Sequence, residues 1–117
     1  MPTLLIADDS MFQRFQAAKT ASEVGFTVIE AKDGEECLTQ ARAHHPEVVL
    51  LDLNMPDPGG LVVMDILSKE LPGIRIVVLT ADIQETTRQR CLKLGAVGFL
   101  NKPADQTALS QVLRDLL

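Results

Sequence analysis

Polar side chains with the chemistry of a metal or phosphate site end four hydrophobic runs of the sequence. Asp8 and Asp9 follow the first run, and Asp52 follows a later one. Thr80 follows another, and Lys102 follows Phe99-Leu100-Asn101. Carboxylates bind hard cations such as Mg²⁺, an ammonium neutralises negative oxygens, and a hydroxyl donates a hydrogen bond. Together, these groups could transfer a phosphoryl group to a carboxylate.

Most of these residues have an ordinary structural explanation when each is considered alone. Asp9 is a reasonable helix N-cap, Thr80 a strand or capping residue, and Lys102 a solvated surface lysine. Asp52 is harder to explain in this way, because a loop over residues 53–60 follows it rather than a helix. Placement of all these groups at strand ends therefore favours a shared site.

The hydrophobic runs predict a parallel sheet. Apolar runs of about five residues alternate with amphipathic segments of about a dozen, a pattern typical of strand–helix units. The carboxyl ends of parallel strands share one edge, where open sheets of this type bind ligands. The polar side chains are therefore expected to meet there. The predicted strands are Thr3–Ala7, Thr27–Ala31, Val48–Leu51, Arg75–Leu79 and Gly98–Leu100.

Five helices are predicted between and after these strands. The first runs from Ser10 to Val24, with Asp9 or Ser10 as N-cap and Gly25 as the left-handed residue that ends it. Its inward stripe is expected to be Phe12, Phe15 and Ala18. The ends of the other four are predicted from Asp33-Gly34, Pro46, Gly59-Gly60, Pro72-Gly73, Thr80, Gly95 and Pro103. Their expected buried residues are Cys37, Leu38 and Ala41; Leu61, Met64 and Leu67; Ile83, Thr87, Cys91 and Leu94; and Leu109, Val112, Leu113 and Leu116.

Length and composition favour one soluble domain. A chain of 117 residues suits a single core, and no further output domain is expected. The net charge of −5 and the dispersed Lys and Arg residues argue against direct nucleic-acid binding. No apolar stretch approaches the roughly 20 residues of a membrane span, and the start lacks a signal-peptide pattern, so a cytoplasmic protein is expected. Cys37 and Cys91 are expected to be buried, reduced thiols.

Six short motifs, taken in order, resemble the receiver domain of bacterial two-component response regulators. They are Asp8-Asp9, Asp52, Asn54-Met55-Pro56, Gly60, Thr80-Ala81 and Lys102-Pro103. The resemblance covers residues 1–117 and implies a single-domain, CheY-like receiver. It implies an α/β fold of the flavodoxin-like, doubly wound type, with five parallel strands in the order 2-1-3-4-5 and five helices. It also implies a phosphoacceptor switch that catalyses only its own phosphorylation and dephosphorylation, and no other enzyme activity.

The resemblance assigns roles to the acidic motifs. Asp52 corresponds to the phosphoacceptor, which receives its phosphoryl group from a phosphohistidine on a sensor histidine kinase or a phosphotransfer protein. Asp9, Asp52 and the backbone carbonyl of Asn54 correspond to direct Mg²⁺ ligands, and Asp8 acts through water; Mn²⁺ is an alternative ion. Asn54 and Asp82 correspond to the positions that tune spontaneous hydrolysis.

The resemblance also implies a switch. Thr80 and Lys102 correspond to the phosphate-sensing pair, and Ala81 to a small residue that leaves the phosphate accessible to hydrolysis. Phe99 occupies the switch position, where many relatives have tyrosine, although a plain core phenylalanine remains the alternative. In the switching model, Phe99 turns inward and reshapes a face formed by the fourth helix, fifth strand and fifth helix. A downstream partner is expected there, although solvation alone would also explain its polar residues Gln84, Arg88, Gln89, Lys93, Gln106 and Gln111.

Three rival functions fit the sequence less well. A phosphohydrolase of the haloacid dehalogenase type would carry a DxD motif, whereas Asp8 and Asp9 are adjacent. A flavin or nucleotide binder would have Gly, Ser or Thr in the first loop, because two aspartates repel phosphate. A receiver-like scaffold that never accepts phosphate would not need the complete set of polar residues.

Overall fold

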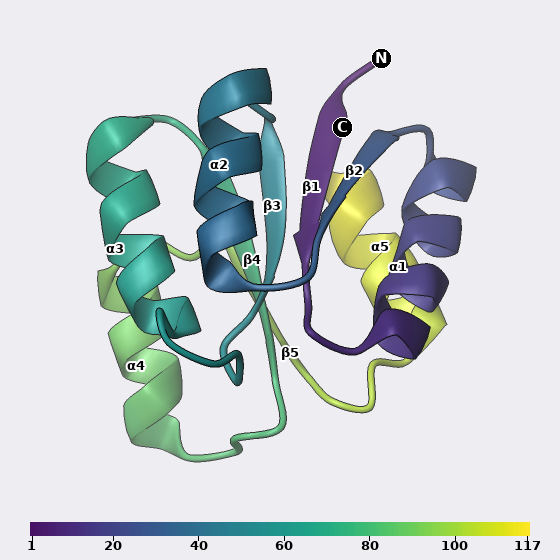
Figure 1. Cartoon of the computed structure of the whole chain (residues 1–117). Coiled ribbons are helices and arrows are strands. Elements are labelled where there is room, and N and C mark those ends of the chain that lie inside the picture. Colours follow the sequence, from purple (N-terminus) through teal and green to yellow (C-terminus); the bar gives the residue numbers. More distant parts are fainter.

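The computed structural model describes residues 1–117 as five strands alternating with five helices (Figure 1). The strands are β1 (Thr3–Ala7), β2 (Thr27–Ala31), β3 (Val48–Asp52), β4 (Arg75–Thr80) and β5 (Gly98–Asn101). The helices are α1 (Met11–Val24), α2 (Gly34–His44), α3 (Gly60–Glu70), α4 (Glu85–Lys93) and α5 (Gln106–Asp115). All strand pairs are parallel and the order is β2-β1-β3-β4-β5, as predicted.

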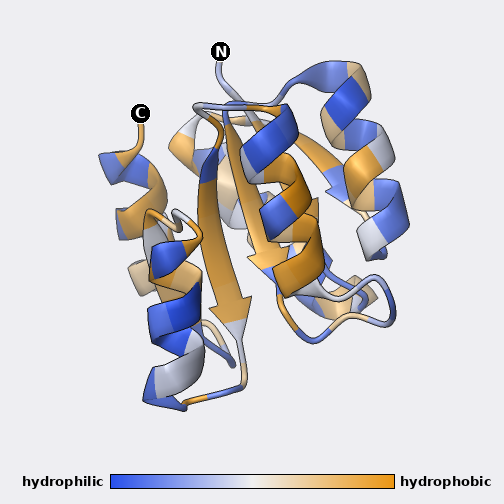
Figure 2. Ribbon diagram, turned by 90° about the vertical axis from the view of Figure 1, so that its left-hand side faces the viewer, coloured by the Kyte–Doolittle hydropathy of each residue, from blue (hydrophilic) through white to orange (hydrophobic).

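Helices cover both faces of the sheet. Helices α1 and α5 lie on one face, and α2, α3 and α4 lie on the other (Figure 1). A hydrophobic core lies on each face of the sheet, and alternate strand residues belong to one core or the other. Leu4 and Ile6 pack toward α1 and α5, whereas Leu5 and Ala7 pack on the opposite face. Figure 2 shows apolar strands behind helices on which polar and apolar residues alternate. The sheet is therefore buried on both sides, which explains its continuous runs of Val, Leu and Ile.

Three strands extend one residue farther than predicted. Strand β3 includes Asp52, which pairs in register with Leu79, and β4 includes Thr80, which pairs with Asn101. The hydrogen-bonded ladder of the sheet thus includes Asp52 and Thr80, two of the predicted site residues. Asp52 and Thr80 are positioned by the sheet rather than by flexible loops.

The predicted inward stripe of α1 is wrong for both phenylalanines. Phe12 is 68% exposed and Phe15 is 66% exposed, whereas Ala17 and Ala21 are buried. The two alanines lie four residues apart and share one face of the helix, so they bring α1 close to the sheet. Ala18 packs against their cluster. The large phenylalanines were more conspicuous in the sequence, but the helix packs through small side chains.

The predicted start of the fourth helix is also wrong. Helix α4 begins at Glu85, and Ile83 is 83% exposed in the preceding loop. The loop persists because the Asp82 amide donates to Thr80 Oγ1 (3.1 Å) and Asp82 Oδ1 accepts from the Gln84 amide (2.9 Å). These contacts satisfy backbone groups without a helical turn.

The remaining helix predictions are largely confirmed. Ser10 is the N-cap of α1 and accepts from the Gln13 amide, and Gly25 has φ = +122° after its last turn. Cys37 and Cys91 are buried and free. Predicted core residues that are buried are Cys37, Leu38, Ala41, Met64, Leu67, Cys91, Leu109 and Leu113, and those half-buried are Leu61, Thr87, Leu94, Val112 and Leu116. None of the helices combines the length and apolar character needed to cross a bilayer.

Candidate functional site

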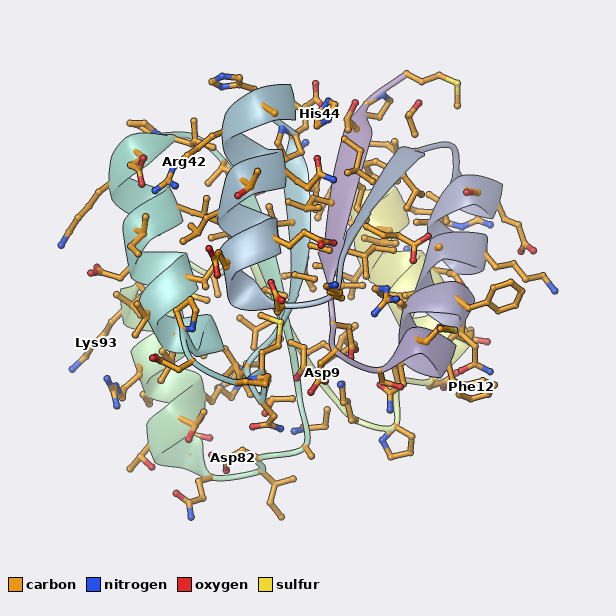
Figure 3. The ribbon with its side chains drawn as sticks, viewed as in Figure 1. Asp9, Phe12, Arg42, His44, Asp82 and Lys93 are labelled. Atoms are coloured by element: carbon orange, nitrogen blue, oxygen red, sulfur yellow. The ribbon has the colours of Figure 1, made fainter.

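Three carboxylates converge at the carboxyl edge of the sheet. Asp8 and Asp9 follow β1, and Asp52 ends β3; one oxygen from each lies within 4.8 Å of the others. Asp8 and Asp52 are buried, each with 2% of its surface exposed, while Asp9 is exposed. Figure 3 shows Asp9 at the same edge of the molecule as Asp82, opposite Arg42 and His44. The structure therefore brings together the predicted acidic residues.

Lys102 reaches into this cluster from the loop after β5. Its Nζ lies 3.0 Å from Asp8 Oδ2 and 3.1 Å from Asp52 Oδ2, and only 12% of its side chain is exposed. The Lys102 amide donates to the Thr80 carbonyl (2.8 Å), and the Lys102–Pro103 peptide bond is cis. Lys102 is thus a largely enclosed counter-ion rather than a fully solvated surface lysine.

Burial and charge shift the pKa values of the central pair. Burial is the largest influence on Asp52 and raises its pKa, which the Asn54 amide and Lys102 offset only partly; the Asp8 charge raises it further. For Lys102, burial disfavours the ammonium, but hydrogen bonding and charge from Asp8 and Asp52 outweigh it and raise the pKa. The ammonium stays charged, and one cation faces two buried carboxylates. The cluster favours a second positive charge.

The carboxylate oxygens fit a small divalent cation. Asp8 Oδ1 accepts from the Ser10 amide, and Asp52 Oδ1 accepts from the Asn54 amide, each at 2.9 Å. The two Oδ2 atoms are buried, and their polar partner is the Lys102 ammonium at 3.0 and 3.1 Å. Such oxygens are the hard ligands that suit Mg²⁺ or Mn²⁺. The donor set therefore matches the predicted metal site.

Thr80 lies beside the cluster and is fully buried. Its Oγ1 accepts from the Asp82 amide (3.1 Å) and from Asn54 Nδ2 (3.4 Å). Asp82 in turn accepts from Thr87 Oγ1 (2.6 Å) and the Gln84 amide, and these bonds lower its carboxyl pKa. The Thr80 hydroxyl is thus linked to the start of α4 through Asp82.

The remaining predicted site residues lie around this edge. Ala81 is exposed. Phe99 is half-buried, pairs in register with Val78 and packs against the core between the sheet and α2, α3 and α4. The predicted partner face is mostly exposed: Gln84, Arg88, Gln89, Lys93 and Gln111 are exposed, and Gln106 is half-buried.

Two residues at this edge escaped prediction from the sequence. Arg14 Nη1 donates to the Asp8 carbonyl (2.8 Å), and Asn101 Nδ2 donates to the Thr80 and Asp82 carbonyls (3.4 and 3.2 Å). Both bind backbone oxygens. Sequence motifs of reactive side chains do not indicate such contacts with backbone carbonyls. These contacts depend on how far a side chain reaches in the folded protein.

Curated relatives carry this domain within longer proteins. The chain is 40% identical over 110 residues to "Protein-glutamate methylesterase/protein-glutamine glutaminase 2" of Anaeromyxobacter dehalogenans, covering 92% of this chain and 32% of that protein. It is 32% identical over 118 residues to "Response regulator GacA" of Pseudomonas aeruginosa, covering 99% of this chain and 55% of that protein. The chain thus spans between about a third and just over half of these relatives.

Solved structures and a family comparison agree with the geometry. The chemotaxis response regulator CheY4 of Vibrio cholerae superposes with a TM-score of 0.92 at 28% identity, covering 100% of this chain and 99% of that one. The receiver domain of AraT, from Geobacillus stearothermophilus, superposes with a TM-score of 0.89 at 31% identity, covering 98% and 92%. The pattern of the response regulator receiver domain matches residues 4–114. With five polar groups converging at the edge of a 2-1-3-4-5 sheet, the chain belongs to the response regulator receiver domain family.

Proposed function

We propose that this chain is a phosphoacceptor switch in which Asp52 accepts a phosphoryl group from the phosphohistidine of a sensor histidine kinase or phosphotransfer protein. The phosphorylated form then binds a downstream protein. The observation that carries this proposal is the position of Asp52 Oδ2, buried beside two other carboxylates and 3.1 Å from Lys102 Nζ. Membership of the receiver family supports it.

The proposed reaction is an exchange of one phosphorus bond for another. A carboxylate oxygen of Asp52 attacks phosphorus, a P–O bond forms, and the P–N bond to the donor imidazole breaks. The bonding electrons of the P–N bond return to the imidazole nitrogen. Lys102 offers its ammonium to the phosphoryl oxygens, and the Thr80 hydroxyl is available as a hydrogen-bond donor once it rotates from its present partners.

Asp8, Asp9 and Asp52, with the carbonyl of Asn54, are the residues that would hold Mg²⁺. The ion would supply positive charge against the oxygens of the transferring group. Asp8 and Asp52 enter with one oxygen already fixed by a backbone amide, so their free oxygens are pre-oriented. Asn54, Ala81 and Asp82 are proposed to govern the attack of water on phosphorylated Asp52. No turnover of a separate substrate is proposed.

The proposed signal passes through Thr80 and Phe99. Movement of the Thr80 hydroxyl toward a phosphoryl group would break its bonds from Asn54 and Asp82 and release the loop before α4. Phe99, half-buried on the neighbouring strand, could then turn inward and reshape the α4–β5–α5 face. Phosphorylation would shift a population only if the phosphoryl group binds that arrangement preferentially. The kinase partnership also favours a cytoplasmic location.

Labelling by acetyl phosphate tests the phosphoacceptor. With Mg²⁺ the protein should acquire a phosphoryl group, and Asp52→Asn or chelation of the metal should abolish labelling. Asp57→Asn is the matched control, because Asp57 is an exposed aspartate in the loop that follows β3, five residues after Asp52. This control should label as the unmodified protein does. Peptide mass analysis that located the group on another residue would refute the assignment.

A further inference from the structure

We propose that Arg14, working with Glu30, is a positioning residue that holds the Asp8–Asp9 loop in the geometry that binds Mg²⁺. This inference rests on the metal site of the proposed function. Neither residue lies among the carboxylates themselves. Their role would be exerted through the backbone that carries the metal ligands.

Arg14 connects three elements through two different nitrogens. Its Nη1 donates to the Asp8 carbonyl at 2.8 Å, and its Nε donates to Glu30 Oε1 at 3.2 Å. Arg14 lies on α1, Asp8 follows β1 and Glu30 belongs to β2. The Arg14 side chain is only 15% exposed, although Glu30 is 49% exposed. The guanidinium is therefore a largely enclosed brace rather than a mobile surface charge.

The amide of Asp8 is fixed by β2. It donates to the Ala31 carbonyl at 3.1 Å, so the N–H of Asp8 is held by β2 and its C=O by Arg14 of α1. The Asp8 carbonyl belongs to the planar peptide group that leads into Asp9. Fixing this oxygen therefore also fixes the direction in which the chain enters Asp9. Strand β2 gives no side chain to the carboxylate cluster, yet through Arg14 it sets where two of its members lie.

Geometry and charge predict opposite effects on Mg²⁺ affinity when Arg14 is removed. As a nearby positive charge, Arg14 would repel Mg²⁺, and its removal would tighten binding. As a brace, it orders the ligands, and its removal would weaken binding. Lysine separates these cases, because it keeps the charge but has one nitrogen and cannot reproduce a fork with two donors.

Calorimetric titration with Mg²⁺ tests the brace. The chain contains no Trp and no Tyr, so intrinsic fluorescence gives little signal. We expect Arg14→Met and Arg14→Lys both to bind Mg²⁺ roughly tenfold more weakly than the unmodified protein, as is usual for outer partners of metal ligands. Glu30→Gln should show a smaller loss. Arg42→Met removes another ion pair, between Arg42 near the end of α2 and Glu70 at the end of α3, at the opposite end of the molecule from Asp9, and should leave the affinity unchanged.

Labelling by acetyl phosphate supplies a second readout. Arg14 contacts no reacting atom. In the Arg14 variants, the Mg²⁺ concentration for half-maximal labelling should therefore rise about tenfold, in line with the binding loss, while the rate at saturating Mg²⁺ stays near that of the unmodified protein.

Equal affinities in all the variants would overturn the inference, and so would tighter binding by Arg14→Met with no change in Arg14→Lys. If Arg14→Met does not fold, Arg14→Lys decides. An unmodified protein that neither binds Mg²⁺ nor labels would instead refute the proposed function itself.

Discussion

Asp8 and Asp52 use their two carboxylate oxygens in the same way: one oxygen accepts a local backbone hydrogen bond, and the other faces the site. In each, Oδ1 accepts from the backbone amide two residues later, which is the local bond that aspartate forms readily in turns. The second oxygen of each then points to Lys102. One residue type thus both turns the chain at a strand end and presents a free oxygen. This explains why aspartate ends β3 although no helix follows it directly.

Loss of the Asp52 charge should stabilise the metal-free protein. Burial raises the pKa of Asp52, so keeping this group ionised costs folding free energy at neutral pH. In the presence of a chelator at pH 7, Asp52→Asn should unfold at a temperature roughly 2 to 5 °C higher than the unmodified protein. Lys102 keeps its other partner, Asp8, in the variant. Thermal unfolding followed by circular dichroism measures the difference.

The pH dependence of this gain has a defined sign. A raised folded-state pKa means that the stabilising contribution of Asp52 is fully present below its ordinary pKa of 3.8. That contribution is lost as the pH rises through the raised value. The advantage of Asp52→Asn should therefore be largest at neutral pH and shrink toward pH 4. A variant that is less stable at pH 7, or whose gain grows on acidification, would contradict this account.

At the level of elements, the start of α3 packs tightly against the end of β3. A Cβ on Gly60 would lie 2.5 Å from Leu53 Cα and 2.8 Å from the Asp52 carbonyl, so backbone would have to move. The neighbouring Gly59 has no atom within 4 Å of such a position. Glycine is therefore required at position 60, because the start of α3 closely approaches the backbone of Asp52 and Leu53.

Alanine substitutions at the two glycines should differ in effect. Gly60→Ala should destabilise the fold by about 2 kcal/mol through overpacking, and should slow labelling because it displaces the Asp52 backbone. Gly59→Ala places the same methyl group in open space and serves as the control. Urea unfolding compares the two variants. Similar losses of stability in both would show that backbone entropy, rather than steric contact, governs this loop.

The sequence predicts most elements because their patterns are continuous, and it fails where small or local features decide. The buried strands have unbroken apolar runs, and glycines and prolines mark several helix ends. The sequence pattern gives the wrong orientation for α1 because Ala17 and Ala21 form its packing face, while larger apolar residues face solvent. It gives the wrong start for α4 because Thr80 and Asp82 satisfy the loop backbone by their own hydrogen bonds.

The candidate site could be predicted at the scale of the whole molecule because topology brings its residues together. Parallel strands place their carboxyl ends at one edge, so Asp8, Asp52 and Lys102 meet although they lie far apart in the sequence. The support from Arg14 and Glu30 could not be predicted in this way. It depends on the reach of a long side chain across a helix, a loop and a strand.

Lys102 should couple phosphorylation of Asp52 to the rest of the molecule. Its side chain contacts Asp8 and Asp52, while its amide donates to the carbonyl of Thr80 on β4. Lys102→Ala should still accept some phosphoryl group, but its phosphorylated form should gain little partner binding. Pull-downs with phosphorylated and unmodified protein measure the gain, with Lys69→Ala, an exposed lysine on α3 outside the predicted partner face, as a control for loss of charge. If Lys102→Ala showed the full gain, Lys102 would not be part of the switch.

A crystal structure of the protein with Mg²⁺ and fluoroberyllate, which mimics a phosphoryl group, tests the central claim most directly. We predict beryllium bonded to a carboxylate oxygen of Asp52, Mg²⁺ in contact with Asp9 and Asp52, and Lys102 Nζ directed at a fluorine. Fluoroberyllate bound at another residue, or Lys102 turned away from the carboxylates, would contradict the assignment of Asp52 as the phosphoacceptor.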